Sequence, residues 1–546
     1  MIVDVTILIW SAVPNVYPVD LFEHLWVVDR LERLGISRYF KKEIKQCLDY
    51  VFRNWQEEGI GWASNSQVID VDDTAMAFRL LRLHGYPISP EVFNRFKKGN
   101  EFFCFEGQTS QAVTGMHNLY RASQTMLPGE SILEEACGFS KSFLLQRQRE
   151  NKIQDKWIIS KGLKGEVEYS LNNPWYESLP RVEARNYIDH YGVDDIWIGK
   201  TLYKMFFVNN KVFLDLAIAD YNLCQSFHQR ELAQLLRWYD QCQLASLRFT
   251  KQNPIENFFA ISATLFEPQY SVARNVWAMC SILTSIISDL FNISNCSLED
   301  LKQFLAAIES WDPKLAKGFS QDMKIIFSAI YNTVNNITQE AFVAQGHDIS
   351  PHLKSIWAWY VKSLLLETNW KLTNHSPTLA DYMHNAKSSL AFEAIVTSTL
   401  AFVGDTVGEE ELEHESFHQF MAMLGTIGRI KCDIRSFYNG VGQGTFSCVA
   451  LYQKENPCKS EAEAFHHFQL LFEETMKVIV KEYLQSTMLP RQCKQLQFYM
   501  AKIINFLHSK CNSTTTTSQA SYYANLTLFA PIPQDIQSTT NLKITV

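Results

Sequence analysis

The spacing of apolar residues constrains this chain most, because it is helical almost from end to end. Residues 20–34 place apolar side chains at positions i, i+3, i+4 and i+7, and Gly35 ends the pattern. Signals for β-hairpins are nearly absent. The sequence therefore predicts an all-α protein. Similar patterns predict helices over residues 41–55, 74–84, 90–98, 111–123, 131–148, 182–190, 214–238, 258–266, 271–291, 298–307, 323–345, 351–367, 386–402, 414–436, 461–486 and 490–509.

The predicted helices form two sets, and a chain of 546 residues allows two to four domains. Up to about residue 247 they are short and are joined by loops that contain glycine and proline, which suggests a double-ring α-barrel. Beyond residue 248 they are longer, as in a helical bundle. We therefore predict a barrel that ends at residue 247 and a bundle over residues 248–546.

Charge and hydropathy exclude several classes of function. The net charge is −8, and no basic stripe or polybasic cluster is present, so we expect no nucleic-acid partner. No apolar run approaches the ~20 residues of a membrane span. The 12 cysteines form no Cys-x-x-Cys pair, which favours a reducing compartment without zinc.

Three aspartates stand in the sequence Asp-Val-Asp-Asp at residues 70–73, directly before a predicted helix. Such a run is most often a solvated loop or a helix N-cap. With Thr74 it also fits the Asp-x-Asp-x-Thr of phosphatase-type enzymes, but the preceding residues 62–69 are too polar for the buried strand which that chemistry needs. If the run is enclosed, repulsion and desolvation raise the carboxyl pKa values, and a protonated carboxyl is a Brønsted acid. The run alone leaves these interpretations open.

The surrounding sequence resembles one enzyme family. Residues 70–86 are similar to the Asp-x-Asp-Asp region of plant class II diterpene cyclases, and more narrowly to that of copalyl diphosphate synthases of the ent series. The resemblance runs from about residue 13 to beyond residue 440 and favours the acid interpretation. Supporting similarities lie in residues 13–26, 30–40, 107–115, 155–158, 179–185 and 197–203.

The resemblance implies the terpene synthase βα architecture, with a class II α-barrel (the β domain, residues 38–247) and a class I-like α-bundle (the α domain, residues 248–546). The implied reaction is an isomerisation by an intramolecular lyase. It protonates the terminal alkene of geranylgeranyl diphosphate and closes two rings to give ent-copalyl diphosphate, in gibberellin and other diterpenoid biosynthesis. Alkene protonation requires a preorganised neutral carboxyl in a dry pocket. Aromatic side chains, 13% of the chain, can stabilise the resulting cations.

The family implies roles for the three acids. Asp72, the middle one, donates the proton, and Asp70 and Asp73 raise its acidity and orient it. Mg²⁺ is the implied cofactor, with Asp70 and Asp72 as its candidate ligands.

Three further residues match family positions. Asn15 resembles the asparagine of a His–Asn pair that positions the water which deprotonates the bicyclic cation. Lys156 resembles a lysine that contacts the diphosphate as a point charge, although it also fits a surface lysine. His24 matches a histidine linked to magnesium- and substrate-dependent inhibition, although it also fits a partly buried helix histidine.

The resemblance also implies a location and a partner. Family members act in the plastid stroma and are coupled to a downstream kaurene synthase-type enzyme. No transit peptide or signal peptide is visible in this chain.

The chain departs from the family at its start. Family members carry a γ domain, and their active site lies between the β and γ domains. Residues 1–37 correspond only to a remnant of the γ domain, and the histidine partner of Asn15 is absent. We therefore expect an N-terminally truncated chain, from an incomplete gene model, a splice form or a degenerate copy. The alternatives are a non-catalytic relic and a copalyl diphosphate synthase of other stereochemistry.

Class I chemistry, which ionises the diphosphate with metal ions, is not expected. No Asp-Asp-x-x-Asp occurs after residue 248. The vestige of the second metal motif keeps Asp433 and Ser436. It has Cys432 in place of the asparagine and Gly440 in place of the glutamate. We expect the α domain to be structural.

Overall fold

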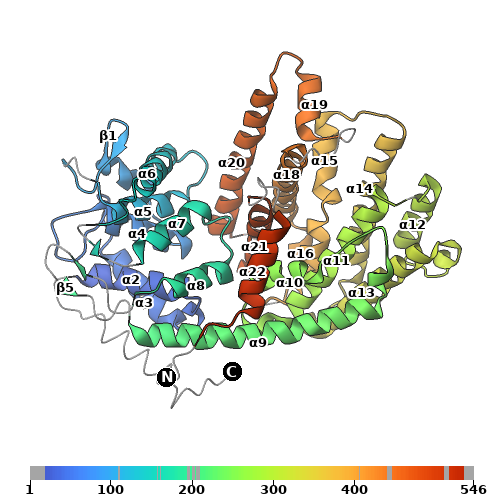
Figure 1. The fold of residues 1–546 in the computed structure, drawn as a ribbon, viewed down its shortest axis with the longest axis horizontal. Coiled ribbons are helices and arrows are strands. Elements are labelled where there is room, and N and C mark those ends of the chain that lie inside the picture. Colours follow the sequence, from blue (N-terminus) through green and yellow to red (C-terminus); the bar gives the residue numbers. More distant parts are fainter. Residues whose placement is uncertain are drawn as a thin grey trace. The chain divides into compact units, whose positions relative to one another are not determined.

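The computed structural model describes residues 19–107, 111–155, 158–159, 162–192, 197–198, 203–204, 210–294, 296–404, 406–438, 446–487, 489–509 and 516–533. Nearly all regular structure in these residues is helical (Figure 1), which confirms the all-α prediction. The chain divides into unit 1, Met1–Leu223 with Pro531–Val546, and unit 2, Cys224–Ala530. No helix in the described part of the chain is both long and apolar enough to cross a bilayer.

Unit 1 holds the acidic run and consists of short helices with a few very short strands. Its helices are α2 (Asp20–Arg33), α3 (Lys41–Arg53), α4 (Val71–Leu83), α5 (Val113–Ser123), α6 (Ser131–Arg149), α7 (Leu163–Asn172), α8 (Pro180–Asp189) and the first part of α9 (Lys211–Gln241), with the 3₁₀ helices η1 (Ser37–Tyr39) and η2 (Pro90–Phe96). The strands are β1 (Lys97–Lys98), β2 (Glu101–Phe102), β3 (Ile158–Ile159), β4 (Trp197–Ile198) and β5 (Tyr203–Lys204).

The strands pair antiparallel in two small sheets, β1-β2 and β3-β4-β5. The helix expected over residues 90–98 is wrong at its end, because Lys98 pairs with Glu101 across a two-residue loop. Gly99 in that loop has a φ of 63°, which glycine adopts without a steric penalty.

Helix α4 is the central helix of unit 1 and carries the acidic run at its start. One side of it, with Met76 and Leu80, packs into a core with α2, α3 and α8. Its other side, with Val71 and Phe78, packs into a second core with α5 and α6. A helix that is apolar on two faces is buried between other elements. The position of its first turn is therefore fixed by packing on both sides.

Unit 2 is a bundle of longer helices. It contains the rest of α9, α10 (Pro254–Ser262), α11 (Ser271–Asn292), α12 (Leu298–Ser310), α13 (Gln321–Gln345), α14 (Ser350–Leu372), α15 (Leu379–Ser389), α16 (Phe392–Leu400), α17 (Glu409–Glu413), α18 (Glu415–Tyr438), α19 (Cys448–Glu455), α20 (Glu461–Gln485), α21 (Arg491–Ser509) and α22 (Thr516–Ala524). Shorter turns are η3 (Leu244–Ser246), η4 (Pro268–Tyr270), η5 (Leu315–Gly318) and the π-helix η6 (Asn525–Phe529).

The single helix expected over residues 386–402 is two helices, α15 and α16. The chain breaks at Ala391, whose φ of 60° is left-handed. Such a conformation is unfavourable for alanine, by ~1–2 kcal/mol, so no local sequence signal predicts it. Packing of α16 against α11 accompanies the break.

Candidate active site

The acidic run forms the first turn of α4. Asp70 is the N-cap, and its Oδ1 accepts a hydrogen bond from the backbone N of Asp73 at 2.9 Å. The backbone N of Val71 donates to the carbonyl of Cys104 at 3.0 Å, which ties the turn to the neighbouring loop. The N-cap interpretation is therefore correct for Asp70, and it leaves the side chains of the two following acids available for another role.

The three carboxyl groups differ in exposure. Asp70 and Asp73 are 5% and 3% exposed, whereas Asp72 is partly exposed. Oδ1 of Asp72 accepts a hydrogen bond from Nδ2 of Asn118, on α5, at 2.6 Å. Asp72 is thus the only member of the run that is both reachable from outside and held by a side-chain donor.

Burial raises the pKa values of all three acids. Burial, followed by the charge of Asp70, raises the pKa of Asp72 to about 8. Burial raises the pKa of Asp70 to about 6, although the N–H of Asp73 opposes the shift. Burial and the charges of its two neighbours raise the pKa of Asp73 well above its usual range. At neutral pH the run therefore holds a proton on Asp72, as a Brønsted acid requires.

A fourth carboxylate stands close to the site. Oδ2 of Asp155 accepts hydrogen bonds from the backbone N and Oγ1 of Thr114 at 2.8 and 2.6 Å, at the start of α5. The charge of Asp155 also raises the pKa of Asp72. Thr114, which binds Asp155, thus lies one turn of α5 before Asn118, which binds Asp72.

Helices α4 and α5 approach closely beside the site, and Gly115 permits it. A Cβ atom at Gly115 would lie 3.0 Å from Cγ1 of Val71 and 3.8 Å from Cβ of Asp72. A larger residue would therefore push α5 away from the acid and lengthen the hydrogen bond from Asn118.

A buried ion network joins α2, α4 and α5 next to the site. Asp29 contacts Arg121 at 2.9 Å, Arg30 at 3.2 Å, Arg33 at 3.8 Å, and Arg79. Burial alone would raise the pKa of Asp29, but these guanidinium groups hold it well below its usual range. The surrounding positive charge also favours the ionised form of Asp72, through Arg30.

A small cavity of about 10 Å³ lies beside this network. Asp29, Arg30 and Arg121 line one part of it, and Thr114 and Asn118 line another. This volume suits one water molecule with several polar partners. The amide of Asn118 therefore lies between Asp72 and a buried polar pocket.

Of the other residues predicted from the sequence, one lies in α2 and two lie outside the described structure. His24 lies in α2, where its Nδ1 is 2.6 Å from the carbonyl of Asp20 and its ring stacks on Tyr50 at 4.5 Å. Burial lowers its pKa, so the ring is neutral at pH 7. Asn15 and Lys156 lie outside the described residues.

Sequence reasoning missed Asn118 and the Asp29 network. Asn118 lies on the buried side of α5, and a polar residue within an apolar helical pattern is the signal that could have indicated it. Asp29 and its arginines have no such signal, because Asp29 lies 50 residues from Arg79 and 92 from Arg121 in the sequence.

In unit 2 the vestige of the metal motif has other partners. The carboxylate of Asp433 accepts hydrogen bonds from the hydroxyl of Tyr382, 3.1 Å from each oxygen, and from the backbone N of Cys448 at 2.6 Å. Arg429 lies 3.9 Å away. Among the described residues no group of three or more His, Cys, Asp or Glu is placed to hold a metal ion. These surroundings do not fit a magnesium site at Asp433.

Comparison with known proteins agrees with this architecture. A model of the terpene synthase N-terminal domain matches residues 3–171, and a model of the terpene synthase family metal binding domain matches residues 240–478. The chain is 48% identical to "Ent-kaurene synthase CPS/KS, chloroplastic" of Physcomitrium patens, over 96% of this chain and 59% of the relative. It is 46% identical to copalyl diphosphate synthase 1 of Selaginella moellendorffii, over 90% of this chain and 66% of the relative. The chain thus spans about three fifths to two thirds of these relatives.

Comparison with solved structures points to the same family. Abietadiene synthase from Abies grandis superposes with a TM-score of 0.90 at 37% identity, over 95% of this chain and 68% of that one. Ent-copalyl diphosphate synthase from Arabidopsis thaliana superposes with a TM-score of 0.75 at 35% identity, over 95% and 67% of the two chains. The chain belongs to the terpene synthase family.

Proposed function

We propose that this chain carries the acid of a class II diterpene cyclase, which converts geranylgeranyl diphosphate to copalyl diphosphate of the ent series. The observation that carries the proposal is Asp72, a partly exposed carboxyl with a raised pKa, held by Asn118 beside two buried acids. Relatives named as copalyl diphosphate synthases support the substrate and the product. The ent configuration rests on the resemblance of Asn15 and His24.

The reaction is an isomerisation with no net gain or loss of protons. The carboxyl of Asp72 gives its proton to the terminal alkene, two carbon–carbon bonds close in succession, and the bicyclic cation loses a different proton to water. The diphosphate stays on the product. As the proton leaves, Asp72 becomes a carboxylate and its hydrogen bond from Asn118 becomes stronger. An ionised acceptor forms a stronger hydrogen bond than a neutral one. Burial and the charge of Asp70 keep the proton on Asp72 before the alkene arrives.

The remaining assignments extend this proposal. Asn15 positions the water that removes the last proton, Lys156 contacts the diphosphate, and residues 1–37 correspond to a remnant of the γ domain. The barrel and bundle correspond to residues 38–247 and 248–546. The names of several relatives include the word chloroplastic, which supports a plastid location. One relative is named an ent-kaurene synthase CPS/KS, which supports coupling to a kaurene synthase-type enzyme.

Magnesium has no step in this proposal. Asp70 and Asp72 each use one oxygen for a hydrogen bond, and the raised pKa of Asp72 disfavours the ionised form that binds Mg²⁺. In unit 2 the partners of Asp433 leave it unsuited to ionise a diphosphate with metal ions. We therefore propose that the product of this chain keeps its diphosphate.

The test is an assay of the purified chain with geranylgeranyl diphosphate, followed by dephosphorylation and chiral chromatography. Asp72→Ala should lower turnover by at least ~100-fold, the scale of a lost general acid. Asp215→Ala, at an exposed ion pair on α9, is the matched control and should retain activity. Equal product from the parent and Asp72→Ala would refute the acid assignment. An inactive parent would favour the non-catalytic relic, and product of another configuration would refute the ent assignment alone.

A further inference from the structure

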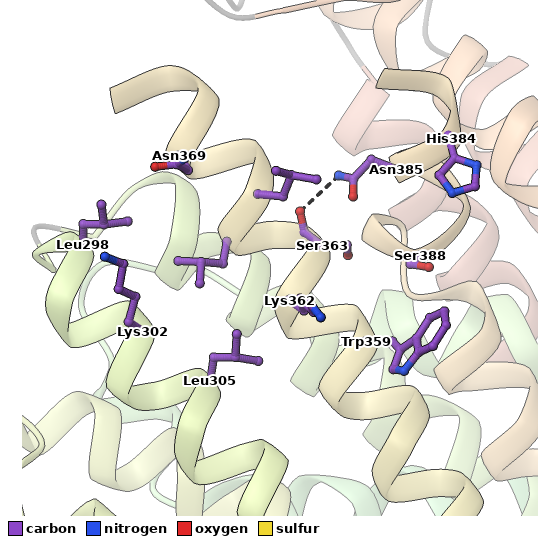
Figure 2. A pocket seen from close by; sticks show the side chains of 12 residues that line it. Leu298, Lys302, Leu305, Trp359, Lys362, Ser363, Asn369, His384, Asn385 and Ser388 are labelled. Atoms are coloured by element: carbon purple, nitrogen blue, oxygen red, sulfur yellow. Dashed lines mark hydrogen bonds between the residues drawn. The ribbon is translucent and has the colours of Figure 1, made fainter. Parts of the chain in front are cut away.

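A large groove lies in unit 2, on helices that do not carry the vestigial metal motif. It has a volume of about 650 Å³ and is lined by residues of α12, α14 and α15 (Figure 2). Asp433 and Arg429 lie on α18 and are not among the lining residues. Ligand sites for small molecules commonly have volumes of 300–1,000 Å³, so the groove is of a suitable size for one.

The floor of the groove is apolar and unusually exposed. Leu298 and Leu305 line it from α12, and Trp359 and Leu366 line it from α14. Trp359 is 68% exposed and Leu366 is 41% exposed. Exposed apolar side chains that gather on one surface in this way mark a site that another molecule can cover.

The apolar surface continues along α14. Leu365 lines the groove, and Leu372 follows it by seven residues on the same face of the helix. Leu372 is 60% exposed. The apolar strip therefore extends beyond one end of the groove, which suits an elongated ligand better than a compact one.

The charge of the groove is positive. Lys302 on α12 and Lys362 on α14 line it, and the lining contains no aspartate or glutamate. Neither ammonium group forms an ion pair with any residue that the structure describes, in a chain of net charge −8. The nearby Glu367 is engaged by Arg429 at 2.8 Å. The two lysines are thus available to an anion.

A fixed polar wall closes one side. Asn385 on α15 is buried, and its Nδ2 donates to the carbonyl of Ser363 at 3.0 Å, as Figure 2 shows, and to Glu367 at 3.1 Å. These bonds hold α15 against α14, so this wall is preformed.

We propose that this groove binds an anionic amphiphile. A flexible apolar chain would lie on Leu305, Leu366 and Trp359, and Lys302 and Lys362 would bind a phosphate or carboxylate head group as point charges. Polyprenyl diphosphates and fatty acids share this chemistry. The groove is independent of Asp72 and does not rest on the proposed cyclisation.

Photoaffinity labelling of the full chain tests the proposal. The probe is geranylgeranyl diphosphate with a benzophenone on its terminal isoprene unit, and labelled peptides are mapped by mass spectrometry. We expect labels in residues 298–305 and 359–372, reduced at least tenfold in Lys302→Glu/Lys362→Glu. The matched control is Lys314→Glu/Lys317→Glu, two exposed lysines of η5 and its N-cap, which should label as the parent does. Cyclisation should be unchanged in both double variants.

Competition experiments then distinguish a polyprenyl diphosphate from a fatty acid as the ligand. Unlabelled geranylgeranyl diphosphate that displaces the probe where palmitate does not identifies a polyprenyl ligand, and the reverse identifies a fatty acid. Displacement by inorganic diphosphate alone would refute the role of the apolar floor. Absence of label from these helices, or equal label in Lys302→Glu/Lys362→Glu when circular dichroism shows it is folded, would overturn the proposal and favour a protein partner for Trp359.

Discussion

Asp72 meets two requirements that usually oppose each other. An acid that protonates an alkene must keep its proton at neutral pH, and it must also release that proton to a poor acceptor. Burial, followed by the charge of Asp70, satisfies the first, since together they raise the pKa of Asp72 to about 8. The hydrogen bond of 2.6 Å from Asn118 favours the second, because it stabilises the carboxylate that remains.

This balance predicts a pH dependence. The acid form of Asp72 is lost as the pH rises through about 8, so kcat/KM should fall above that pH with a slope of one proton. Asn118→Ala removes a bond that lowers the pKa of Asp72, so the decline should move to higher pH. The rate at pH 7 should fall by ~10-fold or more, the scale of a hydrogen bond to a charged group. A lower rate with an unmoved pH profile would contradict this role and indicate a structural effect.

At the scale of the residue, the three acids could be predicted from the sequence, but Asn118, which holds Asp72, could not. Three aspartates in four residues are visible in any sequence, and their family context predicts which one acts. Asn118 lies 46 residues from Asp72 in the sequence. Its contribution depends on the close approach of α5 at Gly115, and periodicity does not specify how closely two helices pack.

At the scale of the element, α4 must begin at Asp70 for the acids to be placed as they are. Asp70 stabilises the helix as an N-cap, but burial raises its pKa to about 6, so its ionisation opposes folding. A group whose pKa is raised on folding contributes stability below its unfolded pKa and loses it as the pH rises through the folded value.

Two substitutions of Asp70 separate these effects. Asp70→Asn keeps a capping oxygen without the charge and should be more stable than the parent at pH 8, by roughly 1–3 kcal/mol. At pH 5 the gain should be about half as large, because that pH lies between the unfolded pKa of 3.8 and the folded pKa of about 6. Asp70→Ala loses the cap and should be less stable than Asp70→Asn by about 0.5–2 kcal/mol at both values. Urea unfolding followed by circular dichroism measures both. Equal stability of Asp70→Asn and the parent at pH 8 would contradict the buried-charge argument.

The Asp29 network fixes the three helices around the site. Asp29→Asn leaves four arginines facing a neutral amide, and breaking a buried pair in this way costs about 3–5 kcal/mol. Backbone amides of α2, α4 and α5 should then exchange hydrogen faster. Asp49→Asn, at an exposed pair with Lys45, is the matched control and should change little. Unchanged protection of α4 in Asp29→Asn would show that packing alone holds these helices.

The helices themselves were largely predictable, because each buries one or two apolar faces and periodicity reports that burial directly. The errors arise where tertiary packing overrides local preference. Ala391 adopts a left-handed conformation between α15 and α16, and Gly99 turns a predicted helix end into a hairpin. Strands of two residues are too short to show an alternation of apolar and polar side chains.

At the scale of the whole molecule, the chain combines a barrel-like unit with acids and a bundle whose vestigial metal motif has other partners. Superposition on abietadiene synthase covers 95% of the chain, so both units keep the family arrangement of helices. The two units differ in the side-chain contacts of their acids. Asp433 accepts hydrogen bonds from Tyr382 and Cys448, whereas Asp72 accepts one from Asn118 and is partly exposed. From this contrast we predict that the chain reacts by donating a proton from Asp72, and that unit 2 does not ionise a diphosphate.

Incorporation of deuterium from solvent tests that claim most directly. In D₂O the carboxyl of Asp72 exchanges before each turnover, so the proton it adds to the alkene becomes deuterium, whereas the proton lost at the end is the substrate's own. Mass spectrometry of the dephosphorylated product should find one deuterium per molecule, and Asp72→Ala should form no such product. A cyclised product without deuterium, or the same labelled product from Asp72→Ala, would contradict the assignment of Asp72 as the acid.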